Sequence, residues 1–338
     1  MIRNRLLRLA ALFAALLSSL AGAQVHAAEK RVEAIEEKKL VGGKQSIDPE
    51  KGYIFTHGTA RNFGWFIKTP DADDLAKYEA DWREALEKAK KRYPRQLANW
   101  ETDVSIARQT KNTPPPKPVE PTEQNFSINS IELRLGVGFG PQYVFSKGDD
   151  YYSYLMQVEP GTYTYYGPVL NTGNAMGGIC YCMGSVRFEV KAGVITNFGD
   201  FLSKAWIDSA AARKAWSEKE PDKPYAVPLS SLDYAIPQSL AAYPAEQPDL
   251  QAAGKMNNFY GIMIGRMPPV DGVLGYERDT VIDLRAAAAA EAAAAEQGDS
   301  AEVAEEAAEE AADTGEEVTE DATEPAGGEM AETGEAGE

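Results

Sequence analysis

Residues 151–167, YYSYLMQVEPGTYTYYG, carry the pattern that decides the fold. In the first half, every second residue is apolar or aromatic, which is the spacing of a strand with one buried face. These residues are Tyr152, Tyr154, Met156 and Val158. Pro160 and Gly161 are suited to a type II turn, and Tyr163 and Tyr165 continue the alternation beyond it. The stretch therefore predicts two strands joined as a β-hairpin.

Further short strands are expected on both sides of this stretch. Residues 186–190 alternate in the same way, and residues 52–68 are rich in aromatic and β-branched residues. Residues 131–139 also alternate, and their glycines indicate a bulge or bend, because the spacing of a dinucleotide-binding loop is not met. Many short strands with turn signals between them are typical of a β-sandwich. We expect a mainly β fold, a β-sandwich over about residues 40–285.

A helical insertion is predicted at residues 71–121. Apolar residues recur at intervals of three and four from 75 to 104, with charged residues between them, as in an amphipathic helix. Pro94 lies within this pattern, and we expect it to kink the helix or to split it into a helical hairpin. Five prolines between 113 and 121 then predict a stiff polyproline-like connector.

The N-terminal residues 1–27 have the features of a secretory signal peptide. Arginines at positions 3, 5 and 8 precede an apolar run of twelve residues, and small residues follow it. This run is shorter than the roughly 20 residues that cross a bilayer, and no later segment is apolar enough to span one. We therefore expect a periplasmic or secreted protein that has no transmembrane segment after signal cleavage.

The acidic charge is concentrated at the other end, in residues 286–338. This segment has 18 acidic residues and no lysine or arginine, which equals the formal net charge of −18 of the whole chain. Residues 1–285 therefore sum to zero, and no basic surface for phosphates is indicated, so a nucleic-acid partner is not expected. The composition of the segment, rich in alanine and glutamate, predicts a disordered acidic tail.

Residues 159–163, EPGTY, followed by residues 188–195, FEVKAGVI, resemble a group of small secreted bacterial β-sandwiches. The group includes prealbumin-like domains and uncharacterised envelope domains of unknown function. The resemblance covers about residues 126–202, and it implies a β-sandwich fold and a location in the cell envelope. It implies no catalytic residue, and the helical insertion at 71–121 departs from the compact pattern of the group.

The most unusual local cluster is residues 176–183, MGGICYCM. On a strand, Cys180 and Cys182 would share one face, and three interpretations are open. They form a disulfide, which an oxidising compartment favours but which requires a turn or bulge. They are two buried thiols. The third interpretation is that the two cysteines bind a soft metal, copper or zinc, with Met176, Met183 and His57 as further candidate ligands.

The remaining candidates concern binding rather than catalysis. Four tyrosines could form a ligand surface, because each has a flat apolar face and a polar tip, although cross-strand tyrosine pairs are the alternative. They are Tyr152, Tyr154, Tyr163 and Tyr165. No motif of a known hydrolase occurs, and no catalytic residue is predicted. We expect a non-enzymatic protein that binds or scaffolds an envelope protein or glycan. The alternatives are a periplasmic protein that handles copper or zinc and a hydrolase with an unrecognised site.

Overall fold

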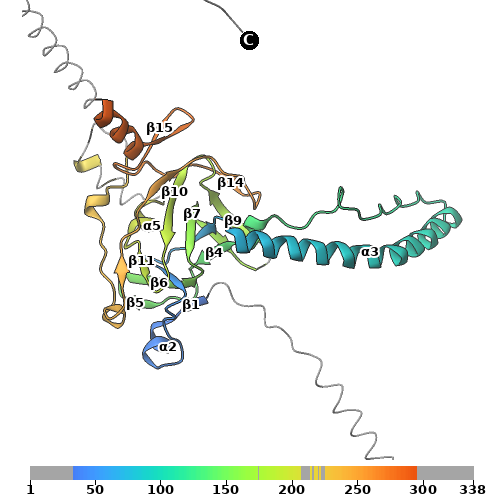
Figure 1. The fold of residues 1–338 in the computed structure, drawn as a ribbon, viewed down its shortest axis with the longest axis horizontal. Coiled ribbons are helices and arrows are strands. Elements are labelled where there is room, and N and C mark those ends of the chain that lie inside the picture. Colours follow the sequence, from blue (N-terminus) through green and yellow to red (C-terminus); the bar gives the residue numbers. More distant parts are fainter. Residues whose placement is uncertain are drawn as a thin grey trace, which may run out of the picture. The chain divides into compact units, whose positions relative to one another are not determined.

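The part of the chain that the computed structural model describes consists of residues 33–173, 175–206, 214, 217–219, 221 and 225–294. The predicted signal peptide, residues 1–27, lies outside it, as do residues 295–338 of the predicted tail. The chain divides into two units, residues 1–285 and 286–338, and all elements below belong to the first. This unit is mainly β, with several sheets and few helices, as the sequence predicts (Figure 1).

Two sheets make up most of the body. Sheet A contains, in spatial order, β1 (Glu33–Ile35), β6 (Tyr151–Val158), β2 (Gly52–Gly58), β11 (Ile195–Asn197) and β12 (Ala245–Glu246), and β5 (Ser146–Gly148) also pairs with β6. Sheet B contains β13 (Gln251–Ala253), β10 (Ser185–Val190), β7 (Gly161–Gly167), β3 (Gly64–Lys68) and β4 (Gly136–Phe139). Sheet B is antiparallel throughout, whereas β11 of sheet A runs parallel to β2 and β12.

Smaller elements lie around these sheets. A three-stranded sheet is formed by β8 (Val169–Asn171), β9 (Met176–Cys180) and β14 (Met263–Ile264), and β15 (Leu274–Glu277) pairs with β16 (Thr280–Asp283). The short helices are α2 (Glu37–Val41), α4 (Ile131–Arg134), α5 (Phe201–Lys204), η1 (Leu229–Ser231) and η2 (Gln238–Leu240). Residues 131–134, which were expected in a strand, are therefore helical, and the strand at this place is limited to β4.

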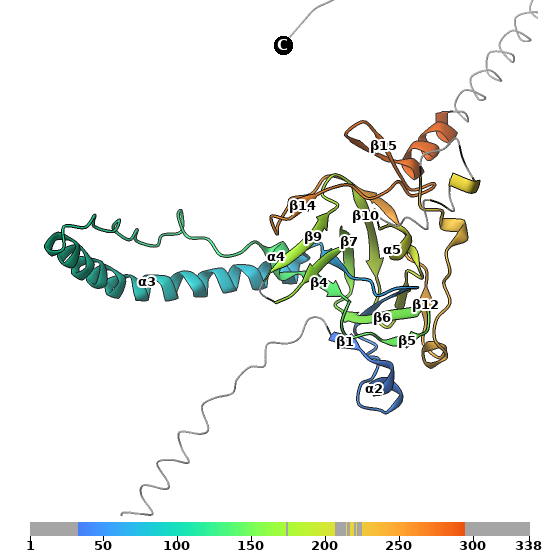
Figure 2. The ribbon, with the colours of Figure 1, turned by 180° about the vertical axis from the view of Figure 1, so that it is seen from behind.

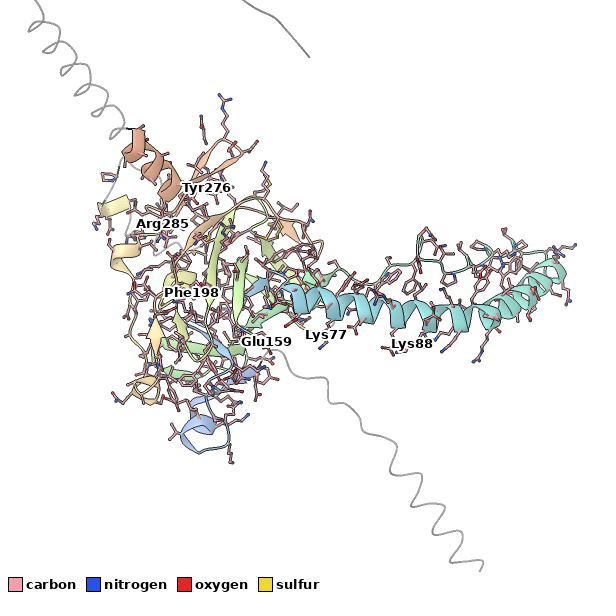
Figure 3. All side chains as sticks on the ribbon, in the orientation of Figure 1. Lys77, Lys88, Glu159, Phe198, Tyr276 and Arg285 are labelled. Atoms are coloured by element: carbon pink, nitrogen blue, oxygen red, sulfur yellow. A yellow bond between two sulfur atoms is a disulfide. The ribbon has the colours of Figure 1, made fainter. Side chains whose placement is uncertain are left out.

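Both sheets contribute side chains to one main core. Phe66 of β3 is fully buried, and its ring centroid lies 5.4 to 5.9 Å from those of four other aromatic rings. These rings belong to Phe139, Tyr165, Phe188 and Phe198, the last of which is labelled in the body in Figure 3. Ile54 and Met156 of sheet A pack into the same core. Burial of this aromatic area is the main stabilising contribution in the body.

The opposite faces of the two sheets are covered as well. In β7, Tyr165 belongs to the main core, whereas Tyr166 joins Ile67 and Val169 in a separate cluster, which we call the outer cluster. Adjacent strand residues point to opposite faces, so sheet B is packed on both sides. On sheet A, Tyr53 and Phe55 likewise belong to a cluster apart from the main core. This explains why β2 is buried along its whole length.

The pairing predicted for residues 151–167 is wrong. Both strands are present, as β6 and β7, but they do not pair with each other. β6 pairs with β1, β2 and β5 in sheet A, and β7 pairs with β3 and β10 in sheet B. The turn at Pro160 and Gly161 therefore passes the chain from one sheet to the other. A tight turn sets the local direction of the chain, and it does not decide which strand pairs with which.

The predicted helical insertion is present as α3 (Ala72–Gln109), which projects from the body (Figures 1 and 2). Its 38 residues correspond to a length of about 57 Å. Asp71 begins it with a capping box, in which its carboxylate accepts from the N–H of Asp74 at 2.8 Å. Pro94 lies inside the helix and does not split it, so the predicted alternative of a helical hairpin is wrong. The helix curves in its distal half (Figure 1).

Residues 110–130 return along α3, and we call residues 71–130 the arm. The indole N–H of Trp82 donates to the carbonyl oxygen of Phe126 at 3.2 Å, and that of Trp100 donates to Pro115 at 2.9 Å. Leu86, on the same face of α3, is buried. The proline-rich segment therefore covers the apolar stripe of the helix. It accepts hydrogen bonds through its carbonyl groups, which proline keeps although it has no N–H.

Lys68 joins the arm to sheet B. It is the last residue of β3, is 5% exposed, and its ammonium group is hydrogen-bonded to the carboxylates of Asp71 and, at 2.6 Å, Asp74. Burial of the ammonium favours its neutral form, but the hydrogen bonds to the two carboxylates outweigh this effect and raise the pKa of Lys68. The hydrogen bond from Lys68 in turn lowers the pKa of Asp71.

Candidate functional site

Cys180 and Cys182 form a disulfide, with their Cα atoms 5.1 Å apart. This separation is typical of disulfides, and it is reached because β9 ends at Cys180, so the second cysteine lies beyond the regular strand. Both residues are buried in the outer cluster. The disulfide interpretation is thus confirmed, and the interpretation as two buried thiols is wrong.

Only part of the proposed metal-ligand set comes together. The disulfide leaves neither sulfur as a thiolate, the form in which cysteine binds metal. Met176 packs against the outer cluster, whereas Met183 lies outside it and donates its backbone N–H to Gly265 at 3.0 Å. Among the described residues, no group of three or more His, Cys, Asp or Glu side chains is placed to hold a metal ion.

His57 is held by the backbone and is 4% exposed. Its Nε2 lies 3.0 Å from the carbonyl oxygen of Asp233, and its ring lies 5.2 Å from that of Tyr151. The neighbouring hydroxyl of Thr56 donates to the carbonyl of Gly199 at 3.1 Å. These contacts connect β2 to the loop after β11 and to the loop after η1, and Oδ2 of Asp233 lies 4.0 Å from Nε2 of His57.

The predicted tyrosine surface is wrong for three of its four members. Tyr154, Tyr163 and Tyr165 are each 1% exposed and belong to the main core. Tyr163 donates its hydroxyl to the carbonyl of Glu159 at 2.7 Å, and burial raises the pKa of Tyr165 well above its ordinary value. Tyr152 is partly exposed, but it packs against the same core. The period-two pattern correctly placed these tyrosines on one face of their strands, but this face points into the main core.

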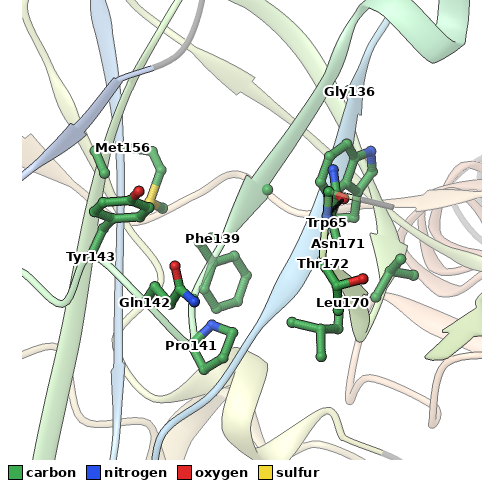
Figure 4. A pocket seen from close by; sticks show the side chains of 15 residues that line it. Trp65, Gly136, Phe139, Pro141, Gln142, Tyr143, Met156, Leu170, Asn171 and Thr172 are labelled. Atoms are coloured by element: carbon green, nitrogen blue, oxygen red, sulfur yellow. Dashed lines mark hydrogen bonds between the residues drawn. The ribbon is translucent and has the colours of Figure 1, made fainter. Parts of the chain in front are cut away.

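An open cleft of about 560 Å³ lies elsewhere, where the edges of the two sheets approach each other. Its walls come from β1, β3, β4, β6 and β8 and from the loops that follow β4 and β8. Figure 4 shows Met156 and Tyr143 on one side of Phe139, and Trp65 and Leu170 on the other. The cleft therefore extends to both sides of β4.

The lining of this cleft is uncharged. It combines aromatic and aliphatic side chains with glycines and with the polar side chains of Gln142, Asn171 and Thr172. None of its lining residues is Asp, Glu, Lys, Arg or His. Few convergent polar groups in an apolar, concave surface are the usual features of a binding site. Such a surface suits an uncharged ligand, because a charged one would lose its hydration without gaining a counter-charge.

Tyr143 stands at the rim with its side chain 66% exposed. Its φ of 54° lies in the left-handed region, which costs a non-glycine residue roughly 1–2 kcal/mol. The preceding Gly140 has a φ of 57°, and a Cβ there would collide with the carbonyl of Asn62. The loop after β4 is thus held in a costly conformation that presents an aromatic ring to solvent. Conformations of this kind are concentrated at functional sites.

The outer edge of β4 is open. β4 is the last strand of sheet B, and within the described residues only β3 pairs with it. Lys68 donates its N–H to Leu135, so the alternating antiparallel pattern turns the N–H and C=O groups of Gly136 and Gly138 away from β3. Side chains cannot take the place of these glycines, because a Cβ at either one would collide with the indole of Trp65.

The facing edge of β1 is protected. Gln45 donates from its side-chain amide to the carbonyl of Ala34 at 3.1 Å and accepts from the N–H of Glu36 at 2.9 Å. These are the backbone groups through which another strand would pair with β1. One side chain thus closes the outer edge of β1, whose Ala34 lines the cleft, whereas no described strand pairs with the outer edge of β4.

Trp65 connects the cleft with the outer cluster. Its ring lies 5.7 Å from that of Tyr260 in an edge-to-face arrangement, and both residues pack against the outer cluster, which contains the disulfide. Burial raises the pKa of Tyr260 to about 12. The disulfide therefore supports the cleft indirectly, by holding the residues against which Trp65 packs.

The arm offers no comparable surface. Most of its apolar stripe is covered by residues 110–130, although Leu75 is 53% exposed, and its free face carries ion pairs one turn apart, such as Glu84 with Lys88 at 2.5 Å. Lys88 is labelled on the arm in Figure 3. Exposed pairs of this kind keep a helix solvated and contribute little to recognition.

No family model matches the chain, and neither a curated protein nor a solved structure matches it. In the part of the chain that the structure describes, no helix is both long enough and apolar enough to cross a membrane. The geometry of the cleft is therefore the basis for a functional proposal.

Sequence patterns did not point to Trp65, Tyr143 or Leu170, because the cleft assembles residues that are distant in the chain. The one local signal was the spacing of Gly136, Gly138 and Gly140, which indicated a bend and not an open edge. Glycines at every second position leave one face of a strand without side chains, and an aromatic side chain from a neighbouring strand can cover that face.

Proposed function

We propose that this chain is an exported cell-envelope protein whose two main sheets form a β-sandwich and which binds an uncharged segment of another envelope component in the cleft. The observation that carries the proposal is an uncharged, aromatic cleft beside an unpaired strand edge. Open edges are normally protected by charge, proline or a covering segment, because they invite pairing with other chains. An edge left open inside a shaped cleft supports a role in binding.

Two further features support the compartment and the architecture. Residues 1–27 have the composition of a signal peptide, and a disulfide is stable in the oxidising periplasm. Side chains of sheet A and sheet B meet in one main core, which is the arrangement expected of two sheets packed face to face.

Binding has more support than catalysis. No carboxylate, imidazole, amine or thiol lines the cleft, so it contains no group that exchanges protons near neutral pH. The alternative of metal handling has less support, because both cysteine sulfurs are in the disulfide and neither is a thiolate. The alternative of a hydrolase has less support, because His57 is only 4% exposed and its Nε2 lies 3.0 Å from the backbone carbonyl oxygen of Asp233.

The test is site-specific photo-crosslinking in the envelope of the producing cell. A benzophenone amino acid replaces Tyr143 at the rim of the cleft, and in a control chain it replaces Asp271, an exposed residue that does not line the cleft. We expect an adduct from position 143 and none from position 271.

A charge in the cleft provides the second arm of the test. Leu170→Asp puts a carboxylate into the uncharged lining, and Leu75→Asp makes the same change at an exposed leucine of the arm. We expect the adduct at position 143 to disappear with Leu170→Asp and to persist with Leu75→Asp. Equal adducts at both crosslinker positions, or an adduct that survives Leu170→Asp, contradict the proposal.

A further inference from the structure

The chemical nature of the ligand can be inferred from the backbone of β4. We infer that the cleft takes an extended polypeptide segment, which adds as a strand to the open edge of β4 and pairs with the backbone groups of Gly136 and Gly138. This inference rests on the proposed function and specifies its ligand.

The first argument is the contrast between the two edges at the cleft. At β1, the carbonyl of Ala34 and the N–H of Glu36 are occupied by Gln45. At β4, the N–H and C=O groups of Gly136 and Gly138 point outward, and no described strand pairs with them. Another peptide backbone has donors and acceptors at the matching spacing, and addition of a strand to a sheet edge is an established mode of peptide recognition.

The second argument is the distribution of side chains on the two sides of β4. A strand beside β4 would place alternate side chains on opposite faces of sheet B. On one face they would meet the exposed ring of Tyr143, beside Phe139 and Met156, which are largely buried in the main core. On the other they would meet Trp65 and Leu170 (Figure 4). The cleft thus provides two apolar subsites, one for odd and one for even residues of the segment.

The third argument is the absence of side chains at two positions. Gly136 and Gly138 face the indole of Trp65, and they present no side chain toward a neighbouring strand on that face. A large apolar residue opposite Gly138 therefore has room to contact Trp65, since cross-strand partners of a glycine meet only backbone. The expected segment is uncharged, about five residues long, and carries an aromatic or aliphatic residue at that position.

The probe is a library of random linear heptapeptides, selected on the full chain after signal cleavage and counter-selected on the Leu170→Asp variant. Each selected peptide is then resynthesised with single N-methyl groups. Methylation of an amide that faces β4 is expected to weaken binding about tenfold, because one backbone hydrogen bond is lost and the methyl group separates the strands. Methylation of the adjacent amides, which face away from β4, is expected to change affinity less than about twofold.

Hydrogen exchange of the protein's own amides locates the pairing. With saturating peptide, the amide protons of Gly136 and Gly138 are expected to exchange at least about tenfold more slowly. Gly254 and Gly272, two glycines with open surroundings, serve as controls and are expected not to change.

Different outcomes separate this inference from the proposed function. A peptide that depends on Leu170 but leaves exchange at Gly136 and Gly138 unchanged overturns strand addition and leaves the binding function intact. Protection of both glycines without peptide overturns it too, and a dependence on protein concentration then identifies a second copy as the occupant. If no peptide distinguishes the wild type from Leu170→Asp, a polypeptide ligand is excluded, and the adduct at position 143 alone decides whether the cleft binds another component.

Discussion

The body and the arm of this protein are stabilised in different ways. In the body, Phe66 touches four other aromatic rings from three further strands and the loop after β11, so each contact joins segments far apart in the sequence. In the arm, the contacts join α3 to the segment that directly follows it, through single indole hydrogen bonds from Trp82 and Trp100. Loss of a body contact should therefore affect the whole unit, whereas loss of an arm contact should remain local.

The largest loss in the free energy of unfolding is expected from a substitution at the centre of the body. Phe66→Ala removes a fully buried ring and should lower the free energy of unfolding by about 3–5 kcal/mol. Urea unfolding followed by near-ultraviolet circular dichroism measures it. Phe63→Ala is the matched control, because Phe63 is partly exposed and contacts the ring of Trp206, and it should cost less than about 1.5 kcal/mol. Equal costs at the two positions would contradict a core centred on Phe66.

A substitution at Lys68, which joins the arm to the body, should give the next largest loss in the free energy of unfolding. Lys68→Met leaves the carboxylate of Asp74 without its buried partner, which should cost about 2–3 kcal/mol and loosen the first turns of α3. Amide exchange at residues 72–78 is the measurement, because it separates loosening of the arm from unfolding of the body. Lys88→Met removes the exposed pair with Glu84 and should cost at most about 0.5 kcal/mol. If both variants behave alike, Lys68 does not hold the arm.

A single indole in the arm should matter less. Trp100→Phe keeps an aromatic ring but removes the hydrogen bond to Pro115, which should cost about 1 kcal/mol within the arm. Limited proteolysis should then cut residues 113–121 faster, while the urea midpoint of the body stays as in the wild type. A lowered midpoint for the body would show that the two regions unfold together and would remove the distinction between them.

The smallest effect depends on pH. The hydrogen bond from Lys68 lowers the pKa of Asp71 below its ordinary value of 3.8, so the cap contributes fully above that value. The contribution is lost as pH falls through the lowered pKa, because the protonated carboxyl group no longer pairs with Lys68. Helical circular dichroism between about pH 6 and pH 2 should show a small loss of helical signal, which arises at the start of α3. Asp71→Asn keeps a capping side chain without the charge and should lack this step; a step that persists in it belongs to another group.

Local patterns predicted the local elements of this fold. The period-two residues of 151–158 and 186–190 lie in β6 and β10, and the helical period of residues 75–104 lies in α3. The disulfide was one of three interpretations of Cys180 and Cys182, and the oxidising compartment expected from the predicted signal peptide favoured it.

Pairing and burial could not be predicted in the same way. The turn at Pro160 and Gly161 suits a hairpin and a change of sheet equally well, and one partner of each strand, β2 for β6 and β3 for β7, lies on the other side of the arm in the sequence. Tyr163 and Tyr165 were candidates for a ligand surface because tyrosine suits recognition, but only the packing of both sheets shows that they are buried. The cleft depends on residues between Ala34 and Gly173, and no window of sequence contains them together.

The position of the arm in the sequence also has a kinetic consequence. Tyr53 and Gln157 are cross-strand partners although they lie 104 residues apart, and non-local pairing of this kind makes folding slow. The arm occupies much of the intervening chain, and its two indole hydrogen bonds span 44 and 15 residues, so it can form early. Once the arm has formed, its end brings α4 close to β3, the strand that precedes the arm. The flexible loop that must close before sheets A and B assemble is then shorter by the length of the arm. The arm therefore accelerates the folding of a body to whose core it contributes no side chain.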